Sequence, residues 1–494
     1  MLASGAMITS PPLGPPRSMD SAPGGNVSAP PPSPPSPVST SNPPPAPASP
    51  RRQRILEGPV GPTLLRLALP MVVGIAAVLF FNLVDTFWVG QLGAMELAAM
   101  GFTFPVVMVV TNLTIGLSIG STAVIAASLG EGDPEAPRRL TTDALLFALL
   151  IVAAVCAVGV ATIDPLFRAL GADAETLPLI REYMEPWYLG VGLLVIPMVG
   201  NGAIRATGDT LTPSLVMIAA GLTNAGLDPL LIFGWGPFPA LGLRGAAYAT
   251  LGSYGISFVA CGWLLVRREH LLSFHRPTAA AIAASWRRIL RIGLPAAGTN
   301  LLTPLAAGAI TRLVAQHGPQ AVAAYGAGVR VEGLAMMGVY ALTAALTPFV
   351  GQNHGAGQVD RIRETLRFNV KAAAVWGLAA AAVLALVADP LARLLNEDPA
   401  IVRTTRLFLW IVPASYIPYG IALLVAAMYN AMEKPLKATF LAALRLIALA
   451  VPLAWLGSQL FGIPGLFAGI AAANTVMGIT AALVVRRDLV AHRV

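Results

Sequence analysis

Residues 66–70 read RLALP, and residues 291–295 read RIGLP, so one short pattern returns 225 positions further along the chain. The same offset relates QLG (91–93) to QHG (316–318), AAMG (98–101) to AAYG (323–326), and DPL (164–166) to DPL (389–391). A single register held without a gap over about a hundred residues indicates an internal duplication. The two halves are therefore expected to share one architecture.

The composition places this duplication in a membrane. Of the 494 residues, 56% are hydrophobic and 11% are charged, whereas soluble domains are about 25% charged. Apolar stretches of about 20 residues cross a bilayer as helices, because lipid offers backbone groups no other partner. We expect twelve such spans, at residues 64–90, 97–126, 141–163, 186–206, 212–235, 242–266, 291–316, 321–350, 368–388, 404–430, 436–460 and 463–485.

Six spans per half is an even number, so both halves thread the membrane in the same direction. The expected fold is an all-α integral membrane protein of twelve transmembrane helices in two six-helix lobes, related by a pseudo-twofold axis along the membrane normal. The expected domains are a disordered Pro-rich tail (1–58), an N-terminal lobe (59–270), a cytoplasmic linker (271–290) and a C-terminal lobe (291–488). Disorder is expected in the tail because residues 1–50 hold 16 prolines and two charges, too little apolar material for a core.

The net charge of +8 follows from basic residues that gather at one set of span ends. They include Arg51, Arg52, Arg54, Arg138, Arg139, Arg267, Arg268, Arg287, Arg288, Arg361, Arg363, Lys434 and Lys437. The positive-inside rule then puts both termini in the cytoplasm. We expect the membrane to be a bacterial inner membrane. The charge needs no nucleic acid as partner, and anionic lipid is the expected contact. The two cysteines, Cys156 and Cys261, fall in apolar spans and are expected to serve packing.

Two acids interrupt the apolar spans of the first half. Asp85 lies in the first span, and Asn224 and Asp228 share one helix face of the fifth. Both spans run in the same direction, and the rise per residue puts the two carboxylates at a similar depth of about 24–32 Å. At the repeat offset these positions hold Ile310, Leu449 and Leu453. The scaffold is duplicated and the charges are not, which favours a functional site over an architectural one.

Such a cluster suits a small cation. A buried carboxyl beside a second one can exchange a proton near neutral pH, and carboxylate and amide oxygens are also the ligands of hard cations such as Na⁺. The residues alone leave proton and sodium coupling open. They also leave open a structural hydrogen-bond network.

Several motifs resemble the multidrug and toxic compound extrusion (MATE) family over about residues 59–488. They are LRLALPM (65–71), NLVDTFWVGQLG (82–93), GNGAIRATGDTLTP (200–213), NAGLDP (224–229) and GLRGAAYAT (242–250). Asp in the first span with Asn-x-x-x-Asp in the fifth is similar to the archaeal and DinF-like branch of the wider MOP flippase superfamily. The acid of the tenth span that NorM-like members carry is missing here.

The resemblance implies a site for the coupling ion at Asp85, Asn224 and Asp228, joined by Thr250 and Tyr188. It also implies a conformational hinge at Pro70. Glu332, near mid-membrane in the eighth span, resembles an acid found there in relatives, and we expect it to meet cationic substrates across the cleft. An arginine partner such as Arg312 or Arg445 is the structural alternative. Four methionines are candidates for an adaptable substrate cleft: Met198, Met217, Met336 and Met337.

The expected function is secondary active multidrug export, in which amphiphilic organic cations leave in exchange for H⁺ or Na⁺. No cofactor or catalytic residue is expected, no metal beyond Na⁺, and a monomer is assumed. A flippase for lipid-linked oligosaccharide or peptidoglycan precursor is the alternative, and only Arg312, Arg330 and Arg445 hint at the cationic cavity it needs. A membrane enzyme would need a nucleophile or metal cluster, and ATP drive a phosphate-binding loop; the sequence shows neither.

Overall fold

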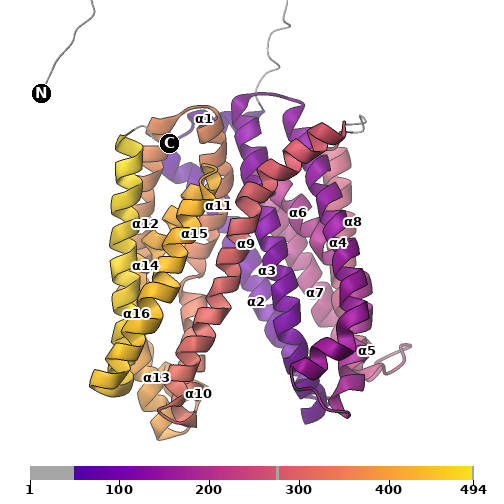
Figure 1. Ribbon diagram of the computed structural model, residues 1–494, viewed down its shortest axis with the longest axis vertical. Helices are drawn as coiled ribbons and strands as arrows, with labels where there is room; N and C mark the ends of the chain where they lie inside the picture. Colours follow the sequence, from indigo (N-terminus) through magenta and orange to yellow (C-terminus); the bar gives the residue numbers. More distant parts are fainter. Residues whose placement is uncertain (1–48, 274–277, 492–494) are drawn as a thin grey trace, which may run out of the picture. The chain divides into compact units, whose positions relative to one another are not determined.

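The computed structural model describes residues 49–273 and 278–491. Residues 48–494 form one compact unit, and nearly all of its described part is helical (Figure 1). The first half contains α1 (Pro50–Glu57), α2 (Val60–Gly90), α3 (Ala94–Glu131), α4 (Ala136–Ala169), α5 (Thr176–Gly190), α6 (Gly192–Ala206), α7 (Leu211–Phe233) and α8 (Gly242–Trp263), with the π-helix η1 (Leu264–Arg268) continuing α8.

The second half repeats this order. It contains α9 (Ala279–Ala315), α10 (Pro319–Ala335), α11 (Met337–Gly355), α12 (Val359–Leu395), α13 (Pro399–Ile411), the 3-10 helix η2 (Val412–Ser415), α14 (Tyr416–Ala431), α15 (Pro435–Ala443), the π-helix η3 (Leu444–Ala450) and α16 (Val451–Val490). The break between α5 and α6 and the break at η2 fall at matching positions of the duplication, since residue 191 plus the offset is residue 416.

Twelve spans account for these helices. By length and composition, 8 described helices can cross a membrane, or up to 10 if the bent pairs α5–α6 and α10–α11 each form one span. Helix α9 adds one span, which follows the arginine-containing N-terminal part of the helix. Helix α16 adds another, because the chain reverses at Gly462, whose φ of 65° lies in the left-handed region. After that reversal Gly469 packs against the backbone of Leu453. The predicted fold class is confirmed.

Each lobe has its own apolar core, but the N-terminal parts of two helices, before Pro70 of α2 and Pro295 of α9, pack into the core of the other lobe. Leu64 and Leu67 of α2 belong to the core cluster of the second lobe, whereas Ile289 and Ile292 of α9 belong to that of the first. These residues are repeat mates, since the offset takes 64 to 289 and 67 to 292. Pro70 and its mate Pro295 follow directly, and each helix then joins its own lobe. The expected lobe limits at 59–270 and 291–488 stay predictions, and packing crosses them.

The lobes meet at the end of the bundle that carries α1 and many of the arginines, which we call the basic end. Here α3 and α9 cross, and a Cβ on Gly120 would lie 2.6 Å from the carbonyl oxygen of Ile289. Glycine is needed because the backbones approach this closely. Gln352 of α11 also donates a hydrogen bond to the Ala206 carbonyl of α6 over 2.7 Å. Away from the basic end the helices of the two lobes separate, with α5 and α10 far apart at the lower edge of Figure 1.

Helix α1 corrects one expectation, because it lies inside the range 1–58 for which we expected disorder. Ser49 caps it and Arg51, Arg52 and Ile55 tie it down: Arg51 pairs with Asp209 at 3.0 Å and with Glu269 at 2.8 Å. Arg52 donates to the Leu129 carbonyl over 2.7 Å, and Ile55 is 2% exposed. These tertiary contacts order α1, for which the neighbouring proline-rich composition suggested disorder. Residues 1–48 of the expected tail lie outside the described residues.

The expected linker 271–290 is shorter in the structure. Helix α9 begins at Ala279, where the side chain of Thr278 accepts a hydrogen bond from the Ala281 amide. The Trp286 indole then donates to the Asp143 carbonyl of α4 over 2.9 Å. These contacts extend the seventh span by more than two turns, and residues 274–277 lie outside the described part.

Candidate functional site

Helices α2 and α7 lie side by side and bring the two acids of the first lobe together. Gly221 of α7 leaves no room for a Cβ against the ring of Phe81 on α2, so the helices touch one turn before Asp85 and two turns before Asp228. Asp85 and Asp228 interact electrostatically across this contact. The structure therefore joins residues 143 positions apart, as the depth argument from the sequence predicts.

The carboxylates are poorly satisfied by the protein. Asn224 donates from Nδ2 to Oδ1 of Asp228 over 3.3 Å. Oδ2 of Asp228 and Oδ1 of Asp85 are buried, and the described residues offer neither a hydrogen-bond partner. Asp228 is 0% exposed, and Asp85 is half-buried. A buried carboxylate oxygen without a donor is costly, which favours a proton or cation as its partner.

Hydroxyl groups complete the surroundings. The side chains of Tyr183 and Thr250 are hydrogen-bonded, and Tyr183 interacts electrostatically with both carboxylates. Tyr254, one turn after Thr250 on α8, interacts with Asp85. Thr250 is therefore at the site, as the resemblance implies. The site is thus lined by oxygen atoms from α2, α5, α7 and α8.

The tyrosine expected at the site lies elsewhere. Tyr188 is 2% exposed, and its ring fills the space beside Gly159 of α4. It lies five positions after Tyr183 on α5, a spacing that points the two side chains in well-separated directions. A single sequence gave no signal for Tyr183. For Tyr254 a signal existed, because it shares a helix face with Thr250 at a spacing of four.

Pro70 lies inside α2, which continues unbroken to Gly90. A proline in a helix removes one backbone hydrogen bond and loosens the ladder. In this chain it also marks the point where α2 passes from the core of one lobe to that of the other. The position is that of a hinge, and hinge motion stays a prediction.

Glu332 lies in the second lobe and has a cation nearby. It interacts electrostatically with Arg445 of η3, and no ion pair of Glu332 within 4.0 Å is found among the described residues. Arg445 instead donates to Asn474 over 3.1 Å and stacks over Tyr419 with 4.6 Å to the ring centroid. Arg312 and Arg330 are exposed on their helices. Of the arginines considered as partners for Glu332, Arg445 is the one in reach.

The four methionines do not share one surface. Met336 is 0% exposed in the core of the second lobe, at the break between α10 and α11, so it does not line a cleft here. Met198 packs against the core of the first lobe. Met217 and Met337 are half-buried. Met336 therefore does not line the expected cleft, because the break between α10 and α11 places it in the core. For Met198, Met217 and Met337 the cleft stays a prediction.

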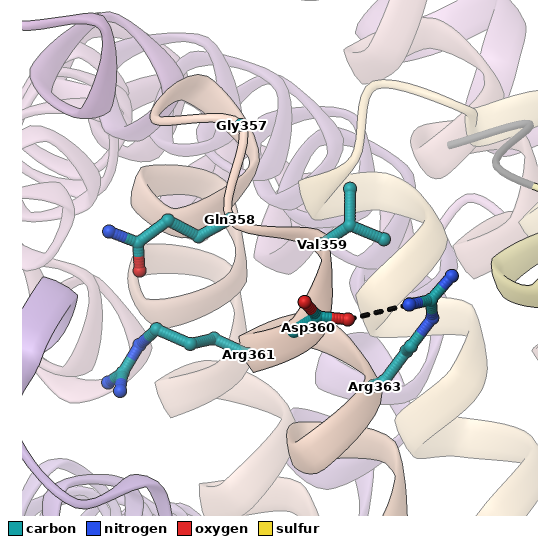
Figure 2. A pocket seen from close by; sticks show the side chains of 6 residues that line it. All are labelled: Gly357, Gln358, Val359, Asp360, Arg361 and Arg363. Atoms are coloured by element: carbon teal, nitrogen blue, oxygen red, sulfur yellow. Dashed lines mark hydrogen bonds and ion pairs between the residues drawn. The ribbon is translucent and has the colours of Figure 1, made fainter.

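One pocket of about 410 Å³ lies at the turn from α11 to α12, away from the carboxylate site. In Figure 2, Asp360 and Arg363 form an ion pair on one side of the turn, and Gln358 and Arg361 extend to the other. Arg361 is occupied by the Ile55 and Gly58 carbonyls at 2.9 and 2.7 Å. The pocket belongs to the packing of α1 rather than to the carboxylate pair. In the described part of the chain, no group of three or more His, Cys, Asp or Glu side chains forms a metal cluster.

Comparison with known proteins identifies the class. The MatE family model matches residues 70–230 and 295–456, and the chain belongs to this family. A curated relative, the FAD transporter of Shewanella oneidensis, is 39% identical over 428 residues, which cover 87% of this chain and 95% of the relative. The multidrug export protein MepA of Staphylococcus aureus is 23% identical and covers 87% and 94%.

A solved structure agrees with the whole membrane unit. The Vibrio cholerae MATE transporter VcmN in the bent form superposes with a TM-score of 0.83 at 32% identity, covering 89% of this chain and 98% of VcmN. The resemblance inferred from the motifs is confirmed, and the protein is a multi-pass membrane efflux transporter.

Proposed function

We propose that this transporter couples the entry of H⁺ or Na⁺ at Asp85 and Asp228 to the export of a small organic substrate. One observation carries the proposal: the buried carboxylate of Asp228 and the half-buried carboxylate of Asp85 interact in one lobe, and each has a buried oxygen without a hydrogen-bond partner among the described residues. Asn224, Thr250, Tyr183 and Tyr254 supply further oxygens. Such a set holds a proton or a hard cation.

The proposed cycle uses the exchange of the ion for the substrate. With the basic end closed, an ion from outside binds at the carboxylates and reorganises the site, which weakens substrate binding. Linkage requires that substrate weakens ion binding by the same factor. The lobes then reopen at the basic end, the ion leaves, and a new substrate enters. Pro70, at the point where α2 changes lobes, is the proposed hinge.

The proposed orientation puts the basic end and both termini in the cytoplasm of a bacterial inner membrane. It rests on the arginine clusters at this end. The available driving force is large, since one pH unit supplies about 1.4 kcal/mol per proton. A membrane potential of 100 mV adds about 2.3 kcal/mol per charge. One or two ions therefore suffice for export against a steep gradient, and a monomer is sufficient for this cycle.

Two cargo classes have specific support. A flavin dinucleotide is favoured by the 39% identity to the FAD transporter over nearly its full length. A multidrug cargo is supported by relatives named for multidrug resistance or multidrug export, and the half-buried acid Glu332 favours amphiphilic organic cations within that class. We place the flavin first because that relative is the more similar. The two differ in one physical respect: an inside-negative potential of 100 mV favours export of an anion by about 2.3 kcal/mol per charge and opposes export of a cation equally.

The experiment is uptake into everted membrane vesicles with an imposed pH or sodium gradient, measured in parallel for FAD, ethidium and a lipid-linked precursor. Asp85→Asn and Asp228→Asn should abolish gradient-driven uptake. Asp360→Asn, at an exposed ion pair on the basic end, is the matched control and should retain it.

Each result decides one element of the proposal. Unchanged gradient-driven uptake in both site variants contradicts the coupling site. Uptake of FAD without ethidium establishes the flavin class, and the reverse establishes the cation class. Uptake of the precursor alone would favour the flippase alternative.

A further inference from the structure

A second cavity lies at the basic end, between α1, the start of α2 and the start of α7. Its volume is about 270 Å³, and four arginines line it: Arg51, Arg54, Arg66 and Arg268. One acid, Asp209, shares the lining. The cavity is separate from the carboxylate pair, and Pro70 forms part of its wall.

The charges in this cavity do not balance. Asp209, 6% exposed, pairs with Arg51 at 3.0 Å and with Arg268 at 3.1 Å. Glu269, just outside the cavity, pairs with Arg51 at 2.8 Å and with Arg268 at 3.6 Å. These two acids offset two of the four arginines. No acid within ion-pairing distance of Arg54 or Arg66 occurs in residues 49–273 and 278–491, so two positive charges remain.

The polar wall suits an oxyanion. Thr63 and Thr210 are 4% and 3% exposed and line the cavity, and hydroxyl groups can donate to anionic oxygens. Arginine presents several N–H donors in a planar fork that matches phosphate geometry. The unneutralised charge and these donors together indicate a phosphate group as ligand.

Exposed apolar side chains adjoin the cavity on α2 and α7. Leu211, which lines the cavity, is 55% exposed, and Leu69 of α2 and Leu215 of α7 are 64% and 54% exposed. A free phosphate ion makes no favourable contact with such a surface, whereas the acyl chains of a lipid can pack against it. We propose that this cavity binds the phosphate headgroup of an anionic phospholipid of the adjacent leaflet, with its chains along α2 and α7.

The proposed site has a consequence for the transport cycle. Its walls come from α1, from the turns of α2 that pack with the second lobe, and from α7 of the first lobe. A bound headgroup holds these parts together and stabilises the closed basic end. The site would persist whichever cargo the transporter carries.

The test uses the full chain in nanodiscs of phosphatidylcholine, with and without phosphatidylglycerol. Two quantities are measured: the melting temperature of the protein and, by native mass spectrometry, the lipid that the protein retains. Wild type should melt higher with phosphatidylglycerol and retain it. The double variant Arg54→Gln/Arg66→Gln should bind it about fivefold more weakly per arginine removed, the size of one surface basic residue's attraction to anionic lipid. Arg54→Lys/Arg66→Lys should restore part of the binding, since the charge is kept.

The matched control is Arg138→Gln/Arg139→Gln, which removes the same charge from the first turns of α4 at the basic end. It should bind phosphatidylglycerol like wild type. An equal loss of phosphatidylglycerol binding in the control and in the cavity variant would show that only the total positive charge matters, and it would overturn the proposed site. If inorganic phosphate in pure phosphatidylcholine nanodiscs reproduces the stabilisation, the ligand is a free phosphate and the lipid assignment is wrong.

Discussion

Gln352 of α11 donates a hydrogen bond to the carbonyl oxygen of Ala206 on α6 over 2.7 Å, and this bond joins the two lobes. Both residues are buried, so the bond is shielded from water. It lies at the basic end, close to the crossing of α3 and α9. An alternating-access cycle must break such contacts to open this end, which makes the basic end the part of the molecule where the balance of states can be tested.

The crossing of α3 and α9 gives a steric test. In Gly120→Val the added atoms meet the Ile289 backbone, where a Cβ would lie at 2.6 Å, and overpacking of this kind costs about 1–3 kcal/mol. The closed basic end should become less populated. Spin-label distances across the basic end should lengthen, and transport should fall.

Gly298→Val is the control for this experiment. Gly298 lies on α9 near the same crossing, and a Cβ there meets nothing within 4 Å. Its distances should match those of wild type. A wild-type distance distribution in Gly120→Val would show that the crossing does not set the closed state.

Arg361 gives a test of how α1 is held. Its guanidinium donates to the Asn353 side chain at 2.9 Å and to the carbonyls of Ile55 and Gly58. A hydrogen bond to a charged group contributes about 1.5–3 kcal/mol to stability. Because Arg361→Gln removes such bonds, it should lower the melting temperature and expose α1 to protease. Arg367→Gln, on the exposed side of α12, should do neither; equal protease sensitivity in the two variants would rule out Arg361 as the anchor.

The contact between α2 and α7 gives a test of site geometry. Gly221→Val collides with the Phe81 ring and should push α2 from α7, separating Asp85 from Asp228. Gradient-driven uptake should fall while insertion in the membrane is retained. Gly226→Ala on the same helix meets nothing within 4 Å and should stabilise the protein by about 0.5–1 kcal/mol. Loss of uptake in both variants alike would indicate a general defect of α7.

The loop before α5 gives a pH test outside the spans. The Thr176 backbone N–H, and next its hydroxyl, hydrogen-bond Asp173 and lower the pKa of that carboxyl. A lowered pKa contributes stability that is present above the unfolded value of about 3.9 and is lost as pH falls through the folded value. Wild type should therefore melt above Asp173→Ala at neutral pH, and the difference should vanish in acid. Glu175→Ala is the control, and a difference that persists at pH below the folded pKa would contradict this origin.

Much of the architecture could be predicted from one numerical offset and the apolar spans. The pairing of Asp85 with Asp228 also followed, because helical rise and span direction fix depth. Tyr183 could not be predicted, since its rotation on α5 depends on the packing of Tyr188 against Gly159. The sequence does contain a signal for helix α1, but the proline-rich composition of the segment before it obscured this signal. The helix begins with Ser49 followed by a proline and ends before Gly58, which is a typical pattern of helix ends.

The packing of the N-terminal parts of α2 and α9 against the other lobe bears on how the protein can be assembled. A polypeptide ending near residue 270 would leave Leu64 and Leu67 without the partners they have in the other half, and the complementary piece would likewise present Ile289 and Ile292 to lipid or water. Separately synthesised halves should thus depend on each other for maturation, each rescuing its counterpart from degradation when both are made in one cell.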